Sequence, residues 1–234
     1  MRRPLAAALA LLAAAAACTP VVVVPDAERA RARTALDGAQ RYLRVAVTVH
    51  PLFGDTGKRL LLDGPADEAD LLRGAQGERI APPPSERVLP PGTPVRIEQV
   101  EFPTAMVIAR RVVMSPRYHP WVLLSVPGDA RPNVLVLPQT TATAADAVAE
   151  VDRVLTADDP SPVFAALPAE QRAAILRKEL TEGMSTRAVE MAWGQPEKMR
   201  IDRPARTEEW IWPDGKRRAF FSDEKLVRWE RSPG

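Results

Sequence analysis

The sequence predicts an α+β protein in which a β-rich N-terminal unit precedes a smaller unit of two helices and a sheet. Short apolar runs separated by turn residues fill the region between Tyr42 and Leu137. Two helical patterns follow Pro168, and strand-like segments close the chain. The 24 prolines are far above the average of about 5% of residues. They favour many loops between short strands.

The first eighteen residues follow the order of an export signal. Arg2 and Arg3 form a positive region, residues 5–17 are an unbroken run of Leu and Ala, and small residues precede Cys18. The apolar run has thirteen residues, whereas a membrane-spanning helix needs roughly 20. The sequence therefore predicts a signal peptide over residues 1–17.

The Ala-Ala-Ala-Cys sequence at residues 15–18 resembles the bacterial lipobox, although Ala15 stands where Leu is most common. Cys18 is the only cysteine, and an exported chain with one thiol has no intramolecular disulfide partner. We therefore expect lipidation at Cys18. Because Thr19 rather than Asp follows it, we expect an outer-membrane lipoprotein facing the periplasm.

Two other readings of the N-terminus stay open. One is simple secretion, since the Ala-rich stretch also suits the ordinary signal peptidase. The other is an uncleaved anchor lengthened by Val21–Val24, but Pro20 interrupts such a helix because proline removes a helical hydrogen bond.

The charge of the chain argues against nucleic acid as a partner. The formal net charge is +2, and cleavage before Cys18 removes Arg2 and Arg3 and leaves a charge near zero. No basic field remains to attract phosphate backbones. The expected partners are a membrane, reached through the lipid anchor, and an envelope protein.

We expect residues 18–40 to carry the lipid on Cys18 and to form a tether or a short exposed helix. Residues 41–140 form the β-rich domain, because Leu43, Val45, Val47 and Val49 alternate with other residues at the period of a strand. Similar apolar runs recur at 59–62, 95–102, 106–114, 121–126 and 134–137. The spacing favours a small antiparallel barrel or sandwich. The segment Leu89–Val95 resembles the start of a strand in SH3-like barrels.

Residues 141–167 are expected to be a helix and a proline-rich linker. Thr143 and Asp146 form an approximate capping box for a helix ending near Leu155. The Asp-Asp-Pro-Ser-Pro sequence at 158–162 then serves as the linker.

The last unit covers residues 168–234. Pro168 begins one helix and Ser185 caps a second, whose Val189 and Trp193 share a face. Three strand-like segments follow, the first near 197–202 leading into 207–212, the second near 216–222 and the third near 225–230. Trp210 and Trp212 lie on one side of their strand, and we expect them to pack on the helix face.

These residues carry a family resemblance. Gly183-Met-Ser185, the Trp193-Gly194-x-Pro196 helix exit, the Glu208-x-Trp210-x-Trp212 strand and the final strand pair around Phe220-Phe221 and Val227 resemble the SmpA/OmlA family, also called BamE. The resemblance covers about the last 65 residues. It implies two helices packed on a three-stranded antiparallel sheet, and it implies an outer-membrane lipoprotein that supports insertion of β-barrel proteins.

The chain departs from this family in length, since about 145 residues separate Cys18 from the resembling domain. A similar fold serves in other envelope lipoproteins and in β-lactamase inhibitory proteins, so the fold does not fix the function. We expect a structural or interaction module of the cell envelope, acting in outer-membrane protein assembly or envelope integrity. The alternative is a periplasmic ligand-binding or hydrolase-inhibitory module.

The sequence offers no motif for catalysis. The turn at Gly54–Lys58 lacks the first glycine and the Ser/Thr of a phosphate loop, and no Gly-x-Ser-x-Gly occurs. His50 and His119 lack metal-ligand spacing, and the acidic residues at 67–70 lack that of a calcium loop. We expect these acidic residues to be a solvated charge run. The basic residues at 216–218 read as an ordinary surface patch. We expect no enzyme activity, catalytic residue, metal or cofactor, and the sequence assigns no binding residues.

Overall fold

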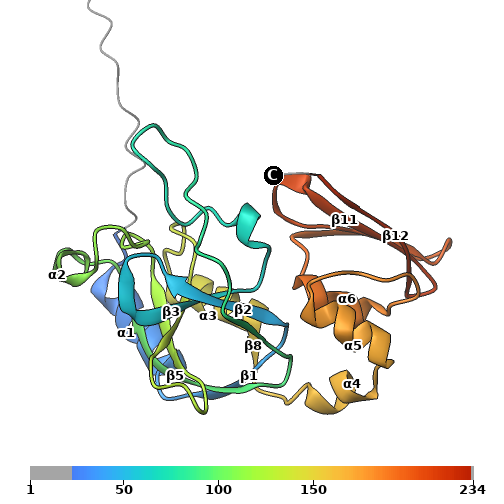
Figure 1. Ribbon diagram of the computed structural model, residues 1–234, viewed down its shortest axis with the longest axis horizontal. Helices are drawn as coiled ribbons and strands as arrows, with labels where there is room; N and C mark the ends of the chain where they lie inside the picture. The colour runs from blue at the N-terminus through green and yellow to red at the C-terminus, as the bar shows by residue number, and fades with distance from the viewer. Residues whose placement is uncertain (1–22, 233–234) are drawn as a thin grey trace, which may run out of the picture.

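The computed structural model describes residues 23–232, so the predicted signal peptide and Cys18 lie outside the described residues. The fold is α+β, with an eight-stranded and a four-stranded sheet. The N-terminal unit occupies one end of the long axis and the C-terminal unit the other (Figure 1).

The larger sheet has the strand order β4, β2, β3, β7, β6, β5, β1, β8. Its pairs are antiparallel except β3 with β7, so the sheet is mixed rather than wholly antiparallel. Strand β1 pairs with β5 (Gln40 with Arg96) and β2 pairs with β4 (Val47 with Leu89), so β1 and β2, which follow one another in the chain, lie near opposite ends of the strand order. The strands are β1 (Gln40–Leu43), β2 (Val47–Leu52), β3 (Asp55–Leu62), β4 (Arg87–Leu89), β5 (Pro94–Glu101), β6 (Trp121–Ser125), β7 (Asn133–Val136) and β8 (Leu155–Thr156).

The predicted alternation near the start of the sheet is confirmed. Leu43, Val45, Val47 and Val49 are all buried in the core of the N-terminal unit. Ala46 points the other way but is also buried, because it belongs to the core of the C-terminal unit. The bend between β1 and β2 is thus covered on both sides.

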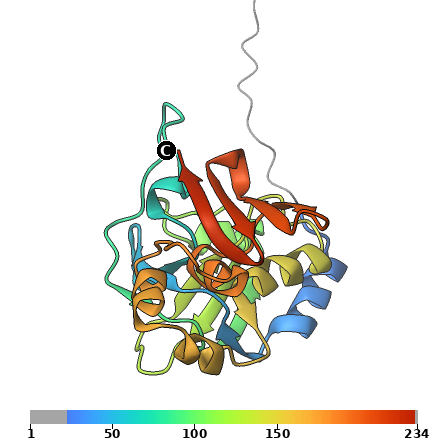
Figure 2. The ribbon, with the colours of Figure 1, turned by 90° about the vertical axis from the view of Figure 1, so that its right-hand side faces the viewer.

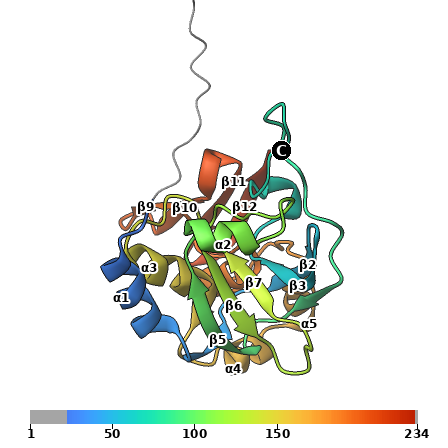
Figure 3. The ribbon, with the colours of Figure 1, turned by 90° about the vertical axis from the view of Figure 1, so that its left-hand side faces the viewer.

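Residues 26–36 form a helix, one of the two expected forms, but this helix packs on the core instead of being fully exposed. Helix α1 (Asp26–Leu36) lies against α3 (Ala144–Val154) and buries Ala32 and Leu36 (Figure 3). The sequence did not show this because only two buried positions, spaced i and i+4, hold the helix on the core.

The capping box of α3 is confirmed. The Thr143 hydroxyl accepts a hydrogen bond from the Asp146 amide (3.1 Å), and the Asp146 carboxylate accepts one from the Thr143 amide (2.9 Å). Hydrogen bonds from Thr143 lower the pKa of Asp146 below its ordinary value, as expected when donors favour the ionised form.

The apolar run at 106–114 is not a strand. Helix α2 (Ala105–Arg110) begins after Thr104, whose hydroxyl accepts a hydrogen bond from the Val107 amide. A turn follows, in which the Ser115 amide donates to the Val112 carbonyl oxygen. The pattern of a short apolar run does not by itself distinguish a strand from a helix. Here the Thr104 cap favours the helix. A single 3-10 turn, η1 (Ala66–Glu68), lies in the loop after β3.

The region expected as a linker contains helix α4 (Ser161–Ala166). Phe164 and Leu167 pack against the C-terminal core. Helix α5 (Ala169–Leu176) starts after Pro168, and α6 (Thr186–Trp193) is capped by the Ser185 hydroxyl, as predicted.

The C-terminal sheet has four strands rather than the three that the family resemblance implies. They are β9 (Lys198–Asp202), β10 (Thr207–Ile211), β11 (Arg217–Ser222) and β12 (Lys225–Arg231), in the order β12, β11, β10, β9, with the 3-10 turn η2 (Pro213–Gly215) before β11. The chain reverses after Asp202, whose carboxylate accepts a hydrogen bond from the Ala205 amide. This reversal makes 198–202 a separate strand. Figure 2 shows the sheet in front of the helices.

Candidate functional site

The C-terminal sheet has one covered face. Trp210 and Trp212 lie on it, as predicted, and are buried together with Trp193 of α6. The Trp193 and Trp212 rings meet edge to face at 5.2 Å, and the Trp212 indole nitrogen donates to the Trp193 carbonyl oxygen (3.0 Å). These contacts make the helix-facing side a specific aromatic core.

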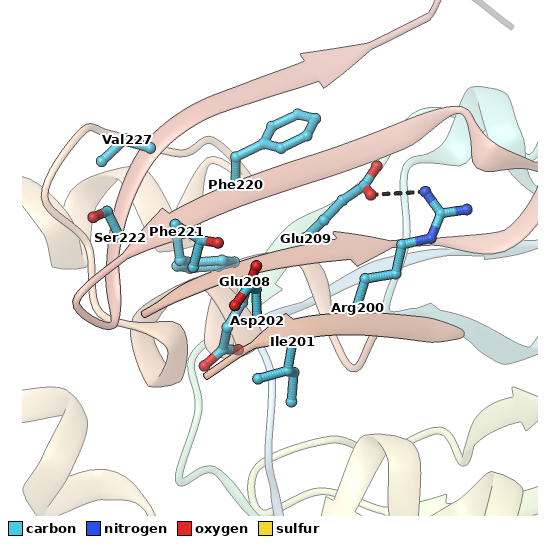
Figure 4. A pocket seen from close by; sticks show the side chains of 10 residues that line it. Arg200, Ile201, Asp202, Glu208, Glu209, Phe220, Phe221, Ser222 and Val227 are labelled. Atoms are coloured by element: carbon cyan, nitrogen blue, oxygen red, sulfur yellow. Dashed lines mark hydrogen bonds and ion pairs between the residues drawn. The ribbon is translucent and has the colours of Figure 1, made fainter. Parts of the chain in front are cut away.

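The opposite side of the sheet, here called the outer face, is hollowed and carries a mixed set of side chains. We define it by Arg200, Glu209, Phe220, Val227 and Arg228. A hollow of about 410 Å³ lies over it, and Figure 4 shows Phe220, Glu209 and Arg200 rising from one side of the strands while Ile201 points to the other.

Two features shape the apolar part of the outer face. The Arg228 guanidinium lies 3.8 Å from the centre of the Phe220 ring, a cation–π arrangement. The register between β11 and β12 shifts next to Phe220, and Val227 is 49% exposed at this bulge. Bulges re-aim side chains, and this one leaves an apolar residue in solvent.

The charged part of the outer face is centred on Glu209. Its carboxylate accepts a hydrogen bond from Arg200 (2.9 Å), and Arg218 lies 3.6 Å away. Arg200 is largely exposed, so this pair adds little to stability and is screened by salt. An open surface with an aromatic centre and arginines at its rim is suited to protein recognition rather than to enclosing a small molecule.

Strand β9 forms one edge of this sheet and pairs only with β10 among residues 23–232. Met199 pairs with Trp210 and Ile201 with Glu208, so both lie on the helix-facing side, where they remain more than half exposed. Edge strands can accept a further strand. Lys198, Arg200 and Asp202 are charges of the kind that discourage non-specific pairing.

The two units meet at a polar junction. The Lys178 ammonium donates to the Ala46 carbonyl oxygen (2.6 Å), and the Ala46 amide donates to the Met191 carbonyl oxygen (2.8 Å). Burial lowers the pKa of Lys178 to about 7, an effect that the nearby Asp63 carboxylate opposes. The junction therefore holds an amine that loses its proton far more readily than an exposed lysine.

An ion pair also crosses this junction. The Arg217 guanidinium lies 3.0 Å from the Glu68 carboxylate, and both side chains are mostly buried. Burial lowers the pKa of Arg217, although Glu68 and Asp63 counteract it. Arg231 also pairs with Asp67 and Glu68. The acidic residues that the sequence suggested as a solvated run are thus partly an inter-unit contact.

A smaller hollow of about 220 Å³ lies beside this junction. Its apolar wall comes from the N-terminal sheet and the loop after β3, and its polar wall from Asp63, Glu68, Lys216 and Arg217. Arg217 points away from the outer face and is buried, while Arg218 reaches Glu209, so residues 216–218 are not the ordinary surface patch that the sequence suggested.

The histidines are engaged by the fold. His50 contacts the Pro83 carbonyl oxygen (2.7 Å) and the Thr48 hydroxyl (2.8 Å), and His119 contacts the Leu137 carbonyl oxygen (2.9 Å). Burial lowers the pKa of His119. Within the described residues no group of three or more His, Cys, Asp or Glu side chains could hold a metal ion. The turn expected at Gly54–Lys58 is confined to Phe53 and Gly54, because the residues from Asp55 onward already belong to β3, where Lys58 pairs with Asp55.

Sequence reasoning missed two groups of residues. Val227 and Phe220 of the outer face depend on a bulge that no local signal announces. The second group is the exposed apolar segment after Thr104, which was expected to be a strand. Its signal was present as an apolar run without a single carboxylate between Phe102 and His119.

Comparison of the chain with protein-family models, with curated proteins and with solved structures finds no match. In the part of the chain that the structure covers, no helix is long and apolar enough to cross a membrane.

Proposed function

We propose that the protein is a cell-envelope lipoprotein, anchored through Cys18 in the outer membrane and facing the periplasm. It acts by binding another envelope protein and not by catalysis. The observation that carries the binding role is the uncovered outer face of the C-terminal sheet, where an exposed Val227 lies near a half-buried, arginine-stacked Phe220. Apolar side chains exposed together mark interaction surfaces.

The proposal includes a finer description of both units. Only residues 44–46 join β1 to β2, although the two strands lie near opposite ends of the strand order, which supports a small barrel closed at this bend. The Trp-lined packing of α5 and α6 on the C-terminal sheet supports an SmpA/OmlA-like unit enlarged by β9. A role in outer-membrane protein assembly or envelope integrity follows from that likeness.

A second function is supported by the hollow at the junction. It combines apolar walls with two acidic side chains, Asp63 and Glu68, and two basic ones, Lys216 and Arg217, a composition that suits a small ligand with polar groups. In this case the protein is a periplasmic ligand-binding or inhibitory module. The two functions differ in what co-purifies with the chain.

Metabolic labelling with a fatty acid tests the anchor. The protein produced in a bacterium should take up the label and partition into detergent, and Cys18→Ser should abolish both. Label retained in the variant would refute the anchor.

Co-purification from detergent-solubilised envelopes tests the partner. Val227→Asp places a charge on the outer face and should reduce recovery of barrel-assembly components several-fold. Val163→Asp is a matched control because Val163 lies on α4 and is 47% exposed, against 49% for Val227. Equal losses with both variants, or a cell-wall hydrolase as the only partner, would contradict the first function.

A further inference from the structure

The exposed large apolar side chains of residues 23–232 gather at the two ends of the molecule. Six of the eleven belong to the N-terminal end, and four belong to the C-terminal sheet described above. The six are Val23, Met106, Val112, Val113, Met114 and Tyr118. The last five lie on α2 and the turn after it, here called the α2 patch. So large an exposed apolar group requires an occupant.

The α2 patch is held rigidly by Arg111, which is almost fully buried beneath it. The Arg111 guanidinium donates to the carbonyl oxygens of Arg117 (3.0 Å) and His119 (2.7 Å) and pairs with Glu101 (3.2 Å). It also lies 3.7 Å from the centre of the Trp121 ring. The backbone that presents the apolar side chains is thus fixed by the core.

The patch also packs over the neighbouring turn. A Cβ atom added at Gly54, between β2 and β3, would lie 3.2 Å from a Val112 methyl group and 3.6 Å from the Met114 Cβ. Met106, Val113 and Met114 nevertheless keep more than half of their surface in solvent. These side chains are displayed by an ordered surface.

The accessible charges of the patch are basic. Residues 102–119 contain no carboxylate, and since Arg111 is buried and paired with Glu101, the accessible charges are those of Arg110 and Arg117. Arg110 is exposed beside the apolar residues, while Arg117 stacks on Tyr118. Apolar side chains next to arginines fit the boundary between acyl chains and anionic headgroups.

The beginning of the described chain lies beside this patch. Val23 and Val24 line the same hollow as Thr104 and Ala105, the residues that open α2. Val23 is five positions after Cys18, a distance that cannot exceed about 18 Å even for a fully extended chain. An acyl chain on Cys18 therefore holds this end of the protein within reach of the bilayer.

We propose that the α2 patch docks on the bilayer surface, with Met106, Val113 and Met114 inserted among the lipids and Arg110 at the headgroups. The proposal rests on the proposed anchor at Cys18. It orients the molecule, because α2 lies at the opposite end of the long axis from the C-terminal sheet (Figure 1), and α2 faces the viewer in Figure 3. The outer face then points away from the membrane, toward a periplasmic partner.

Site-specific probes on the full, lipidated protein test this orientation. Lipidation consumes the only native thiol, so one added cysteine is the sole labelling site. An environment-sensitive probe is attached at Met106→Cys, at Met114→Cys or at the control Met199→Cys, which is 57% exposed on the far sheet. The proteins are reconstituted in vesicles of phosphatidylethanolamine and phosphatidylglycerol.

The probes at positions 106 and 114 should shift to the blue and lose most of their quenching by an aqueous quencher, while the probe at 199 should remain fully quenched. Protein that floats with the vesicles but leaves all three probes equally quenched would overturn the docking and spare the anchor. Failure to float would overturn both. Protection without vesicles that increases with protein concentration would show that a second copy covers the patch, which also overturns the proposal.

Discussion

The Lys178 ammonium nitrogen lies 2.6 Å from the carbonyl oxygen of Ala46 and thereby joins the C-terminal unit to the bend between β1 and β2. The residue keeps some exposed surface, but its charged end is buried. Ala46 itself is fully buried in the C-terminal core. This hydrogen bond links the two units, but it comes from the Lys178 ammonium group, and burying that positive charge costs free energy.

This hydrogen bond predicts a particular dependence of stability on pH. Burial lowers the folded-state pKa of Lys178 from 10.5 to about 7, so between these values the unfolded chain binds the extra proton. The free energy of unfolding should therefore increase with pH from about 7 to about 10, and the penalty should be fully present below that range.

Lys178→Met should remove this slope, and urea unfolding over the same pH range measures it. Because methionine keeps the residue at its positive φ of 59°, backbone strain cancels in the comparison. Parallel pH profiles for the two proteins would show that the ammonium is not titrating in this window.

We predict that a side chain added at Gly92 causes a steric clash at the same boundary between units. A Cβ atom at Gly92 would lie 2.8 Å from the Cα of Ser161, at the start of α4. Gly128 has the same φ of 85° with nothing within 4 Å. Gly128→Ala should cost only the left-handed backbone penalty of about 1–2 kcal/mol.

Gly92→Ala should cost clearly more than Gly128→Ala, because α4 must also move. Thermal unfolding of both variants gives the comparison. Equal losses would mean that α4 yields freely and that the turn does not hold the units together.

The C-terminal fragment is predicted to fold by itself, although only marginally, because a unit of this size buries limited surface. The structure adds that Phe164 and Leu167 contribute to its core. A fragment starting near residue 157 should therefore be more stable than one starting at 168. Circular dichroism and urea unfolding compare them, and two disordered fragments beside a folded full chain would refute the division into units.

Local signals were sufficient where neighbours in sequence decide the structure. The alternation from Leu43 to Val49, the Thr143–Asp146 capping box and the shared face of Trp210 and Trp212 were all predictable. Each depends on the period of a strand or on the first turn of a helix.

The missed features depend on distant residues. Helix α1 is held by Ala32 and Leu36 against a core built later in the chain, and Ala46 is buried only because α6 covers it. The outer face was not predictable for a similar reason: a strand pattern shows which residues share a face, but not that a bulge exposes Val227.

We predict that Arg111→Met alone causes a large loss of stability. Replacing it with methionine leaves the Arg117 and His119 carbonyl oxygens without their donor and leaves Glu101 without its ion-pair partner. Breaking a buried pair from one side costs about 3–5 kcal/mol. Arg110→Met is the matched control, and as an exposed neighbour it should change stability by no more than about 0.5 kcal/mol. Similar values for both variants would show that Arg111 does not organise the α2 patch.

We predict that the buried and the partly exposed tryptophans of the C-terminal sheet contribute differently to stability. Trp210 is 7% exposed and lies against Trp212 and Phe221, with ring centres 6.1 and 4.9 Å away. Trp210→Ala should therefore cost about 3–5 kcal/mol, the usual range for truncating a buried aromatic side chain.

Trp229 supplies the control because it is 39% exposed on the edge strand β12. Trp229→Ala should cost less, since more than a third of the residue's surface already meets solvent and less packing is lost. Melting temperature, measured beside the recovery of the envelope partner, separates the two roles. If Trp210→Ala left the melting temperature unchanged but lowered partner recovery, Trp210 would be a contact residue and the packing of α6 on the sheet would not be what holds this unit together.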